Sequence, residues 1–370
     1  MALAWLTHNG IGLAYNGKGL AIDVTDPYNP LGLGPYTIRV VYGDSPSESW
    51  QPRINFGTAT RVSMSPNVWD ITYENSDWSN LLRVSSSAGY YADRIKGVLG
   101  ANSTGVTNMS YMFSGQSWLG NPSPGWYVMP LFDTSAVTDM SYMFNTASIT
   151  GIPVFDTSNV TNMESMFSFS SLESLPLINT SKVTNMRGMF EWCTALNTAI
   201  PLIDTSSVTD MSYMFHYCNG LPSTTDFDTS SVTNMDSMFE HCISLERISN
   251  YDTINVVSMQ KMMADCTSLL RAPVFRFHTG NVQNMWQLCY GCKKLQAVPQ
   301  LVTTSVTNIN AAFYNCLDVS QGALSLYNSM SSQANPPQYH SGTFTNCGES
   351  TTTGLAELNQ IPTSWGGRMQ

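Results

Sequence analysis

One short pattern recurs along most of the chain and constrains its fold more than any other feature. A core resembling V-x-N-M begins at nine valines: Val106, Val137, Val160, Val183, Val208, Val232, Val256, Val282 and Val306. From the second copy onward the intervals are 23, 23, 25, 24, 24, 26 and 24 residues, whereas the first interval is 31 and carries the insertion SGQSWLGNPSPGWYVM. Repeats of this length are typical of proteins whose neighbouring units stack and bury one continuous core.

The apolar residues inside one repeat have helical spacing. In the segment 160–170, Val, Met, Met, Phe and a small residue lie at offsets 0, 3, 6, 7 and 10, which is one face of an α-helix. The preceding D-T-S favours a helix N-cap, because these side chains accept the free N–H groups of a first turn. The S-L-E-S-L-P segment that follows predicts a short strand halted at proline. Each repeat is therefore predicted to contain a cap, a short helix, a turn and a short strand.

The repeat is similar to a known repeat family. MFEHCISLERI resembles the F-x-x-C-x-x-L unit of BspA-type leucine-rich repeats, and DTSxVTNMxxMF resembles the variant found in mycoplasma-type surface lipoproteins and in bacteriophage and prophage proteins. The resemblance covers about residues 98–318 and implies an α/β solenoid, leucine-rich-repeat-like, with nine repeats of about 24 residues. Members of the family are mostly regarded as adhesins, so the resemblance implies binding and no shared catalytic residue.

Residues 1–97 lack the repeat and predict a β-rich anchoring module. The segments 36–42 and 68–74 alternate and are rich in β-branched and aromatic residues, as strands are. A short helix is expected around D-W-S-N-L-L, and the glycine-rich first 35 residues suggest an extended docking arm. Residues 93–102 are expected to supply the first strand of the solenoid.

Residues 319–370 are predicted to cap the solenoid of residues 98–318, because a repeat stack must cover its last core layer. The stretch ALSLYNSMSSQ predicts a helix, and F-T-N-C-G at 344–348 echoes the repeat. Trp365 is expected to cover the last apolar layer.

Charge and hydropathy exclude several classes of protein. Charged residues make up 11% of the chain and its net charge is −10, without any Lys/Arg run, which argues against nucleic-acid binding. The N-terminus lacks a basic segment followed by an unbroken apolar one, so no signal peptide is expected. No stretch approaches the ~20 apolar residues of a membrane span, so no membrane insertion is expected.

The cysteines favour architecture over chemistry. Six of the eight lie 10 residues after the valine of their repeat: Cys193, Cys218, Cys242, Cys266, Cys292 and Cys316. Earlier repeats carry other residues there, so we predict a structural ladder of buried thiols. Neighbouring rungs should not form disulfides, because packed helices lie about 8–10 Å apart. A zinc site at Cys289 and Cys292 would need two further ligands, and no second pair is present.

Other candidate sites have structural alternatives that we favour. An aspartate before most repeats could indicate stacked calcium sites, but helix capping explains it better. Most methionines lie on the apolar stripe and are predicted to pack in the core. The five histidines share no repeat position, and no nucleophile or phosphate-binding motif is present. No metal, cofactor or catalytic residue is therefore predicted.

The predicted strand face is the remaining candidate for ligand binding. Residues that point outward there differ from repeat to repeat while scaffold positions recur, which suits recognition, although an ordinary solvated face is the alternative. The candidate positions are Glu173, Ser174, Asn197, Thr198, Ser223, Thr224, Glu246, Arg247, Leu270, Arg271 and Gln296.

These observations together predict a non-enzymatic protein that recognises a surface. The expected setting is a bacteriophage particle, as a tail-fibre or head-fibre type of appendage attached to other virion proteins through the N-terminal module. A glycan or protein of a host surface is the expected ligand, and a homo-oligomer such as a trimer is the expected assembly. The alternative is a bacterial cell-surface adhesin of the BspA type, and a glycan depolymerase is the third hypothesis.

Overall fold

The computed structural model describes most of the repeats and selected parts of the N-terminal region. The described residues are the short strands within 3–23, then 34, 36–42, 58–64, 67–73, 75–78, 81, 95–116, 132–149, 155–175, 178–198, 203–272 and 279–369. The chain forms two compact units, Met1–Val160 and Thr161–Gln370. The boundary between them falls inside the repeat region.

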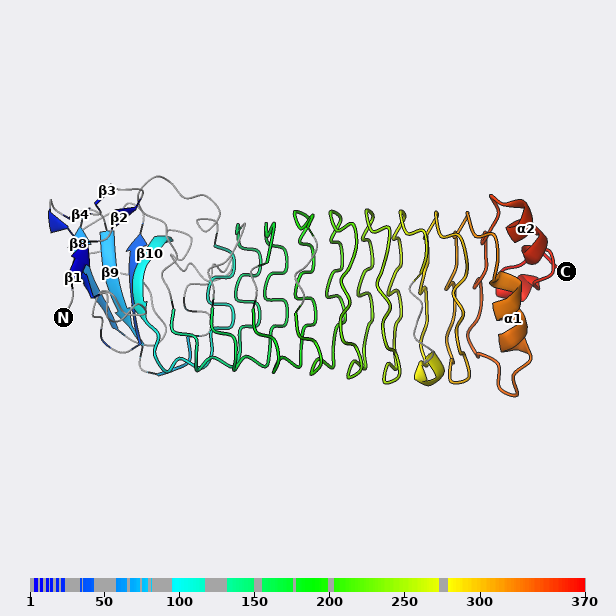
Figure 1. The fold of residues 1–370 in the computed structure, drawn as a ribbon, viewed down its shortest axis with the longest axis horizontal. Helices are drawn as coiled ribbons and strands as arrows, with labels where there is room; N and C mark the ends of the chain where they lie inside the picture. The colour runs from blue at the N-terminus through cyan, green and yellow to red at the C-terminus, as the bar shows by residue number, and fades with distance from the viewer. Residues whose placement is uncertain are drawn as a thin grey trace. The chain divides into compact units, whose positions relative to one another are not determined.

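A four-stranded antiparallel sheet lies in the N-terminal region (Figure 1). Its strands are β7 (Thr37–Tyr42), β8 (Thr58–Met64), β9 (Asn67–Thr72) and β10 (Ile95–Asn102), in the order β10-β7-β9-β8. The strands predicted at 36–42 and 68–74 are thus confirmed as β7 and β9. The prediction for 93–102 is wrong, because β10 pairs with β7 in this sheet and does not begin the repeats.

The first residues fold back on themselves. Three antiparallel pairs are present: β1 (Leu3–Trp5) with β6 (Ala21–Asp23), β2 (Thr7–His8) with β3 (Ile11–Gly12), and β4 (Ala14–Tyr15) with β5 (Lys18–Gly19). The expectation of an extended arm is therefore wrong for these residues, since their backbone groups bond within the segment.

Each repeat forms a coil of turns, so the predicted helices are wrong. We number positions from the valine of the repeat. In all nine repeats positions +5 and +9 have positive φ, as at Ser165 (φ 48) and Phe169 (φ 59) in the repeat of Val160. Glycine meets this requirement at Gly188 and Gly291, but most coils hold a larger residue in a conformation that costs roughly 1–2 kcal/mol and that no right-handed helix contains.

Hydrogen bonds between coils take the place of those within a helix. The N–H groups of Met163, Ser165, Phe167 and Phe169 donate to carbonyl groups of the following coil at 2.7–3.0 Å, not to the carbonyl four residues back. The later coils repeat the same pattern of alternate donors. Satisfied backbone groups between the coils of the second unit offset the strain at positions +5 and +9.

Two lines of parallel β-bridges tie the coils of the second unit together. The first line runs along position +2 through Asn162, Asn185, Asp210, Asn234, Ser258, Asn284, Asn308 and Tyr339. The second bridge line runs through Ser223, Arg247 and Arg271, and Ala297 and Gln321 form a further bridge. Parallel pairing sets adjacent coils at about 4.7–4.9 Å, far closer than packed helices.

The D-T-S tripeptide begins a turn and not a helix. The Oδ1 atom of Asp228 accepts hydrogen bonds from the N–H of Ser230 at 3.0 Å and from its hydroxyl at 2.7 Å, which is the pattern of an Asx turn. The Thr229 hydroxyl donates to the carbonyl of Asp252 in the next coil at 2.7 Å. The tripeptide therefore shapes one coil and joins it to the next.

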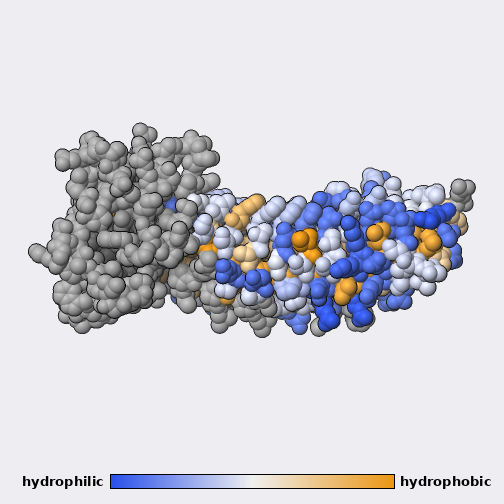
Figure 2. Space-filling view, turned by 90° about the horizontal axis from the view of Figure 1, so that it is seen from above, coloured by the Kyte–Doolittle hydropathy of each residue, from blue (hydrophilic) through white to orange (hydrophobic). Residues whose placement is uncertain are grey.

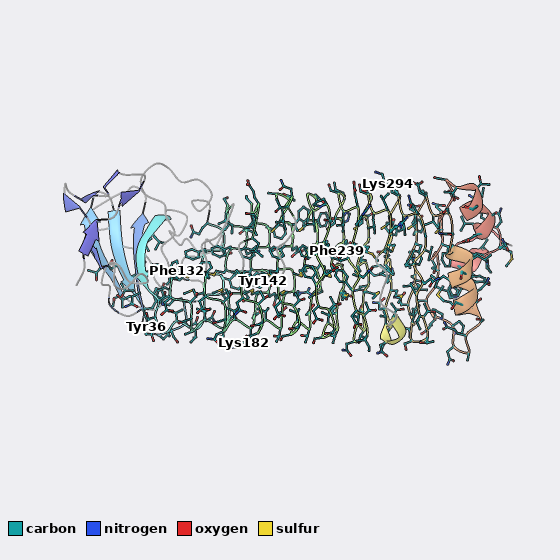
Figure 3. The ribbon with its side chains drawn as sticks, in the orientation of Figure 1. Tyr36, Phe132, Tyr142, Lys182, Phe239 and Lys294 are labelled. Carbon is teal, nitrogen blue, oxygen red and sulfur yellow. The ribbon has the colours of Figure 1, made fainter. Side chains whose placement is uncertain are left out.

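The core consists of similar layers stacked on one another. The Val, Met, Met and Phe of the V-x-N-M-x-x-M-F pattern are 0% exposed in the coils that begin at Val183, Val208 and Val232. Phe190, Phe215 and Phe239 stack with ring centroids 5.4 and 5.6 Å apart. Figure 3 shows Phe239 inside its coil, with Lys182 and Lys294 on opposite edges.

Additional segments cover the first and last layers of the repeats. In the first unit Asp77 forms a parallel bridge with Asn108, and the Trp78 side chain is fully buried. The helix expected around D-W-S-N-L-L falls partly on residues 79, 80 and 82, which lie outside the described residues. In the second unit residues 339–347 add one more coil after the ninth repeat, with Phe344 stacked on Phe313 at 6.0 Å.

The C-terminal segment combines this coil with two helices. The predicted helix is confirmed as α1 (Ala323–Ser331), and α2 (Thr352–Leu358) and the 3₁₀ turn η4 (Thr363–Trp365) follow the added coil. A further 3₁₀ turn, η3 (Thr279–Asn281), lies within the repeats. Trp365 is 7% exposed and stacks on His340 at 4.1 Å, so the end of the stack is covered by aromatic side chains.

Candidate binding surface

An outer aromatic ladder lies on the surface of four successive coils. It consists of the side chains at position +9: Phe169, Trp192, Tyr217 and His241. Their ring centroids are 5.6, 3.9 and 4.2 Å apart, and neighbouring planes deviate by 7–17°. Because each inner ring is stacked on both sides, the ladder offers ring edges and polar ring atoms along its length, and a free ring face only at its ends.

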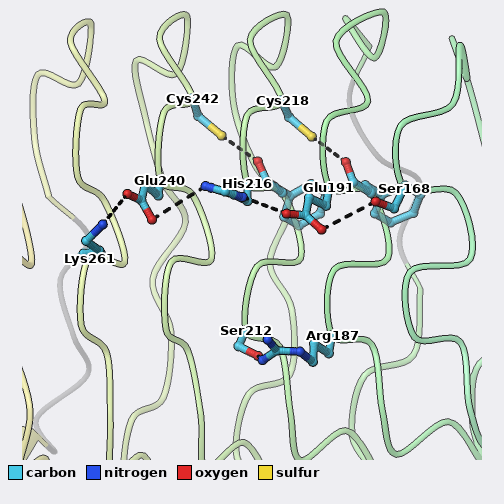
Figure 4. Close-up of polar contacts among 11 residues, drawn as sticks. Ser168, Arg187, Glu191, Ser212, His216, Cys218, Glu240, Cys242 and Lys261 are labelled. Carbon is cyan, nitrogen blue, oxygen red and sulfur yellow. Dashed lines mark hydrogen bonds and ion pairs between the residues drawn. The ribbon is translucent and has the colours of Figure 1, made fainter. Parts of the chain in front are cut away.

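A row of charged and polar groups runs beside this ladder at position +8 (Figure 4). His216 lies between two carboxylates, with Nδ1 2.9 Å from Glu191 and Nε2 3.6 Å from Glu240. Glu240 also pairs with Lys261 at 2.9 Å, and the Ser168 hydroxyl lies 3.5 Å from Glu191. One row of interactions thus links five coils.

The row has the composition of an acid–base site but lacks the arrangement of a nucleophile and its base. Both ring nitrogens of His216 face carboxylates, so neither faces a hydroxyl or thiol that it could deprotonate. The row instead fixes the orientation of the imidazole and joins neighbouring coils. Below it, Arg187 donates to the Ser212 hydroxyl at 2.6 Å and lies 4.6 Å from the centroid of the Tyr213 ring.

The sequence-predicted strand face lies along the second bridge line. Eight of its candidate residues are exposed: Glu173, Ser174, Asn197, Thr198, Glu246, Arg247, Arg271 and Gln296; Ser223, Thr224 and Leu270 are half-buried. In the structure each coil contributes single bridge residues and not a strand. Ser223, Arg247 and Arg271 are brought into register as neighbours, whereas Thr224 is engaged by Ser249 and Tyr251 of the next coil.

The cysteines of the ladder act as hydrogen-bond donors inside the core. Each of the six thiols donates to a carbonyl of the preceding coil at 3.0–3.1 Å, as from Cys242 to Phe215. Burial raises the pKa of Cys193 and of Cys242 to about 12, so both thiols keep their proton at neutral pH. A buried thiol that is always protonated is a poor nucleophile and a poor metal ligand.

The spacing that we used to exclude disulfides is wrong. Adjacent coils pair as parallel strands do, at about 4.7–4.9 Å, which lies within the Cα range that a disulfide can bridge. All eight cysteines are nevertheless free. The cause is direction, because the ladder side chains lie parallel and each sulfur points at a backbone carbonyl.

The aspartate ladder has no metal-binding geometry in the described part of the chain. Hydrogen bonds from Ser158, Ser206 and Ser230 lower the pKa of Asp156, Asp204 and Asp228, so these carboxylates are committed to their turns. Across the described residues, no group of three or more His, Cys, Asp or Glu side chains is placed to hold a metal ion.

The outer aromatic ladder was not predicted from the sequence, although a signal for it exists. Position +9 varies between repeats, whereas position +7 is phenylalanine in seven of the nine and position +10 is cysteine in the last six, and aromatic residues occupy position +9 in consecutive copies. Because we assumed packed helices, which lie about 8–10 Å apart, we did not expect the rings of neighbouring repeats to stack.

Comparison with known proteins identifies the repeats. The family model described as "Mycoplasma protein of unknown function, DUF285" matches residues 91–174, 170–224 and 219–326, which together make up more than half of the chain. No curated protein and no solved structure matches. Within the described residues, no helix combines the length and the apolar character needed to cross a membrane.

Proposed function

The chain belongs to this mycoplasma-type repeat family, and from that premise we propose that it is a non-enzymatic protein whose coils display a recognition surface. As part of the proposal, the coils form a solenoid of the BspA-like, leucine-rich-repeat class in which turns replace helices. The ligand is a glycan or protein on a bacterial or mucosal surface.

One observation carries the proposal: inner side chains repeat and outer side chains do not. Position +7 is a buried phenylalanine at Phe190, Phe215 and Phe239. Two residues later the same coils carry Trp192, Tyr217 and His241. A fixed core with a variable exterior is how repeat proteins supply recognition surfaces.

The setting of the protein is the second part of the proposal. We propose attachment to a bacteriophage particle through the N-terminal module, as a homo-oligomer, with a bacterial cell-surface adhesin as the alternative. The support is the similarity of the repeat block to phage and prophage proteins.

Binding to surfaces tests the recognition function. Fluorescently labelled full-length protein is applied to mucin-coated wells and to a panel of whole bacterial cells, with Trp192→Ala/Tyr217→Ala as the matched surface variant. Saturable retention of the wild type supports the proposal, and weaker retention of the variant would assign the binding to the outer aromatic ladder. Absence of saturable retention on every surface, or release of reducing ends from polysaccharides incubated with the protein, contradicts it.

Immunogold electron microscopy tests the setting. Label on the tails or heads of particles from the native source supports the virion proposal. Label confined to the bacterial envelope supports the alternative and contradicts the virion proposal.

A further inference from the structure

Four cations gather on one edge of the coils without an acidic partner among the described residues. Arg247 and Arg271 are neighbours on the second bridge line, and both are exposed. Lys293 and Lys294 are exposed on the next coil, which is joined to the coil of Arg271 by the bond from Gln296 N–H to the Leu270 carbonyl at 3.1 Å. We call Arg247, Arg271, Lys293 and Lys294 the basic row.

Other described cations of the same unit are already engaged. Lys261 pairs with Glu240 at 2.9 Å, Arg187 binds Ser212 and lies on the Tyr213 ring, and Arg368 pairs with Glu349. The basic row therefore differs from these other described cations in having positive charge without a described acidic partner.

The basic row destabilises the fold through repulsion between its positive charges. Arg247 and Arg271 lie directly opposite each other across a parallel bridge, and like charges in that relation are destabilising. Glu246 is next to Arg247 in the chain, and Asp318 lies on the coil that follows Lys293 and Lys294, so four cations meet two anions and leave a local charge of +2 on a chain of net charge −10. An anionic ligand would relieve this repulsion.

We infer that the basic row binds an acidic polysaccharide, an inference that rests on the proposed recognition function and specifies its ligand. The planar guanidinium groups of Arg247 and Arg271 suit bidentate contact with carboxylate or sulfate. On the preceding coils the same edge carries the neutral side chains of Asn197 and Ser223, which suit sugar hydroxyls. Figure 2 shows strongly hydrophilic side chains gathered over the coils nearer the C-terminus on the face seen from above.

Other anionic polymers fit this edge less well. Peptides bind commonly by adding to a free sheet edge, but here the N–H groups of Glu246, Leu270 and Gln296 already donate to preceding coils. Nucleic acid carries one charge per about 1.7 Å of duplex and requires a larger basic surface than a local charge of +2. A polysaccharide with spaced acidic groups and many hydroxyls matches the sparse charge and the neutral polar surroundings.

Affinity electrophoresis of the full-length protein tests the inference. Native gels contain polygalacturonate, dextran sulfate, neutral dextran or polyglutamate at low salt. Retardation by an acidic polysaccharide and not by neutral dextran is expected, with polygalacturonate and dextran sulfate distinguishing carboxylate from sulfate ligands. Arg247→Gln/Arg271→Gln should weaken the retardation by at least about tenfold, since each charged hydrogen bond contributes about one factor of ten.

Lys182→Gln is the matched control, because it removes an equally exposed cation on the opposite edge of the coils (Figure 3). It should leave the retardation unchanged, whereas Arg271→Lys should lose part of it because the planar fork is gone. Added salt should abolish the retardation by screening. A thermal melt of each variant shows whether it is folded.

Three results would overturn the inference: no retardation by either acidic polysaccharide, equal retardation of wild type and the double arginine variant, or stronger retardation by polyglutamate. The surface-binding assay keeps the two proposals apart. If the double arginine variant still binds cells or mucin as the wild type does, the polysaccharide site is wrong and the recognition function stands. If the wild type is retarded in the gels but binds no cell or mucin surface, the recognition function is wrong.

Discussion

Phe190, Phe215 and Phe239, the inner phenylalanine ladder, stack much as the outer aromatic ladder does. The surroundings of the two ladders are opposite. Phe215 and Phe239 stack at 5.6 Å and are 0% exposed, while Tyr217 and His241 stack at 4.2 Å on the surface. Only one residue separates the two ladders along the chain. Both depend on the close spacing of parallel-paired coils, so the same backbone that closes the core also aligns the exterior.

The difference between the ladders separates stability from recognition. Inner position +7 is phenylalanine in seven of the nine coils, because a cavity in one layer removes contacts from the layers on both sides. Outer positions tolerate Phe, Trp, Tyr, His and Asp because their surroundings are solvent and one another. Substitutions in the two ladders should therefore have unequal effects on the free energy of unfolding.

The largest loss of stability is expected for a substitution in the inner phenylalanine ladder. Phe239→Ala should lower the free energy of unfolding by about 3–5 kcal/mol, because it opens a cavity between two stacked layers. Urea denaturation monitored by circular dichroism measures it. A loss below about 1 kcal/mol would mean that the inner ladder is not a packed core.

A smaller effect is expected at the thiol ladder. Cys242→Ser should cost about 1–2 kcal/mol, since the shorter hydroxyl is buried and reaches the Phe215 carbonyl less well than the thiol does at 3.0 Å. Any binding should persist. Loss of binding in a folded Cys242→Ser protein would instead show that the cysteines belong to a ligand-binding site.

The turn at Asp228 is expected to contribute less and to depend on pH. Asp228→Ala should cost about 1 kcal/mol at neutral pH, by analogy with loss of a cap, whereas Asp228→Asn should cost little because Asn179 makes the same bonds in its own coil. Hydrogen bonds from Ser230 lower the pKa of Asp228 in the folded protein. Its contribution is therefore complete above the unfolded pKa of about 3.9 and is lost as pH falls through the lower folded value.

The Asp228 variants check this sign directly. Unfolding measured between neutral pH and strongly acidic pH should show the wild type approaching Asp228→Ala as the carboxylate is protonated. The Asp228→Asn protein should lack this part of the pH dependence. A wild-type contribution that grows on acidification would contradict the assigned cause of the pKa shift.

The smallest change in stability is expected for a substitution in the outer aromatic ladder. His241→Ala should change the free energy of unfolding by about 0.5 kcal/mol, because it removes one half-buried stacking partner and a weak 3.6 Å pair with Asp265. Thermal melts measure the change against the Phe239→Ala protein. Equal losses from the two variants would erase the distinction between the ladders.

Sequence reasoning identified which residues are buried but not the backbone that buries them. Apolar residues at offsets 0, 3, 6, 7 and 10 are compatible with a helix face, and they are equally compatible with a coil containing left-handed residues at +5 and +9. The residue types gave no sign of this coil, because residues such as Tyr213 and Trp192 rarely adopt positive φ. Hydrogen bonds between repeats decide the outcome, and they are non-local.

The same non-local spacing explains what was missed at the surface. The second bridge line was expected to display variable residues, and its exposed positions do so. The register that sets Arg247 against Arg271, and Trp192 against Tyr217, follows only from the stacking of complete coils. Spacing in the sequence alone does not determine it.

The coil requires left-handed backbone at positions +5 and +9 of each repeat, and one substitution tests this requirement directly. Ala311 occupies position +5 with φ 53, and its N–H donates to the Ser341 carbonyl at 3.1 Å. Ala311→Gly should raise the free energy of unfolding by about 0.5–1 kcal/mol, because glycine relieves the strain of positive φ. Ala312→Gly, the next residue, should lower it by about 1 kcal/mol. A right-handed helix in the repeat requires both glycines to be destabilising, and that result would contradict the coil.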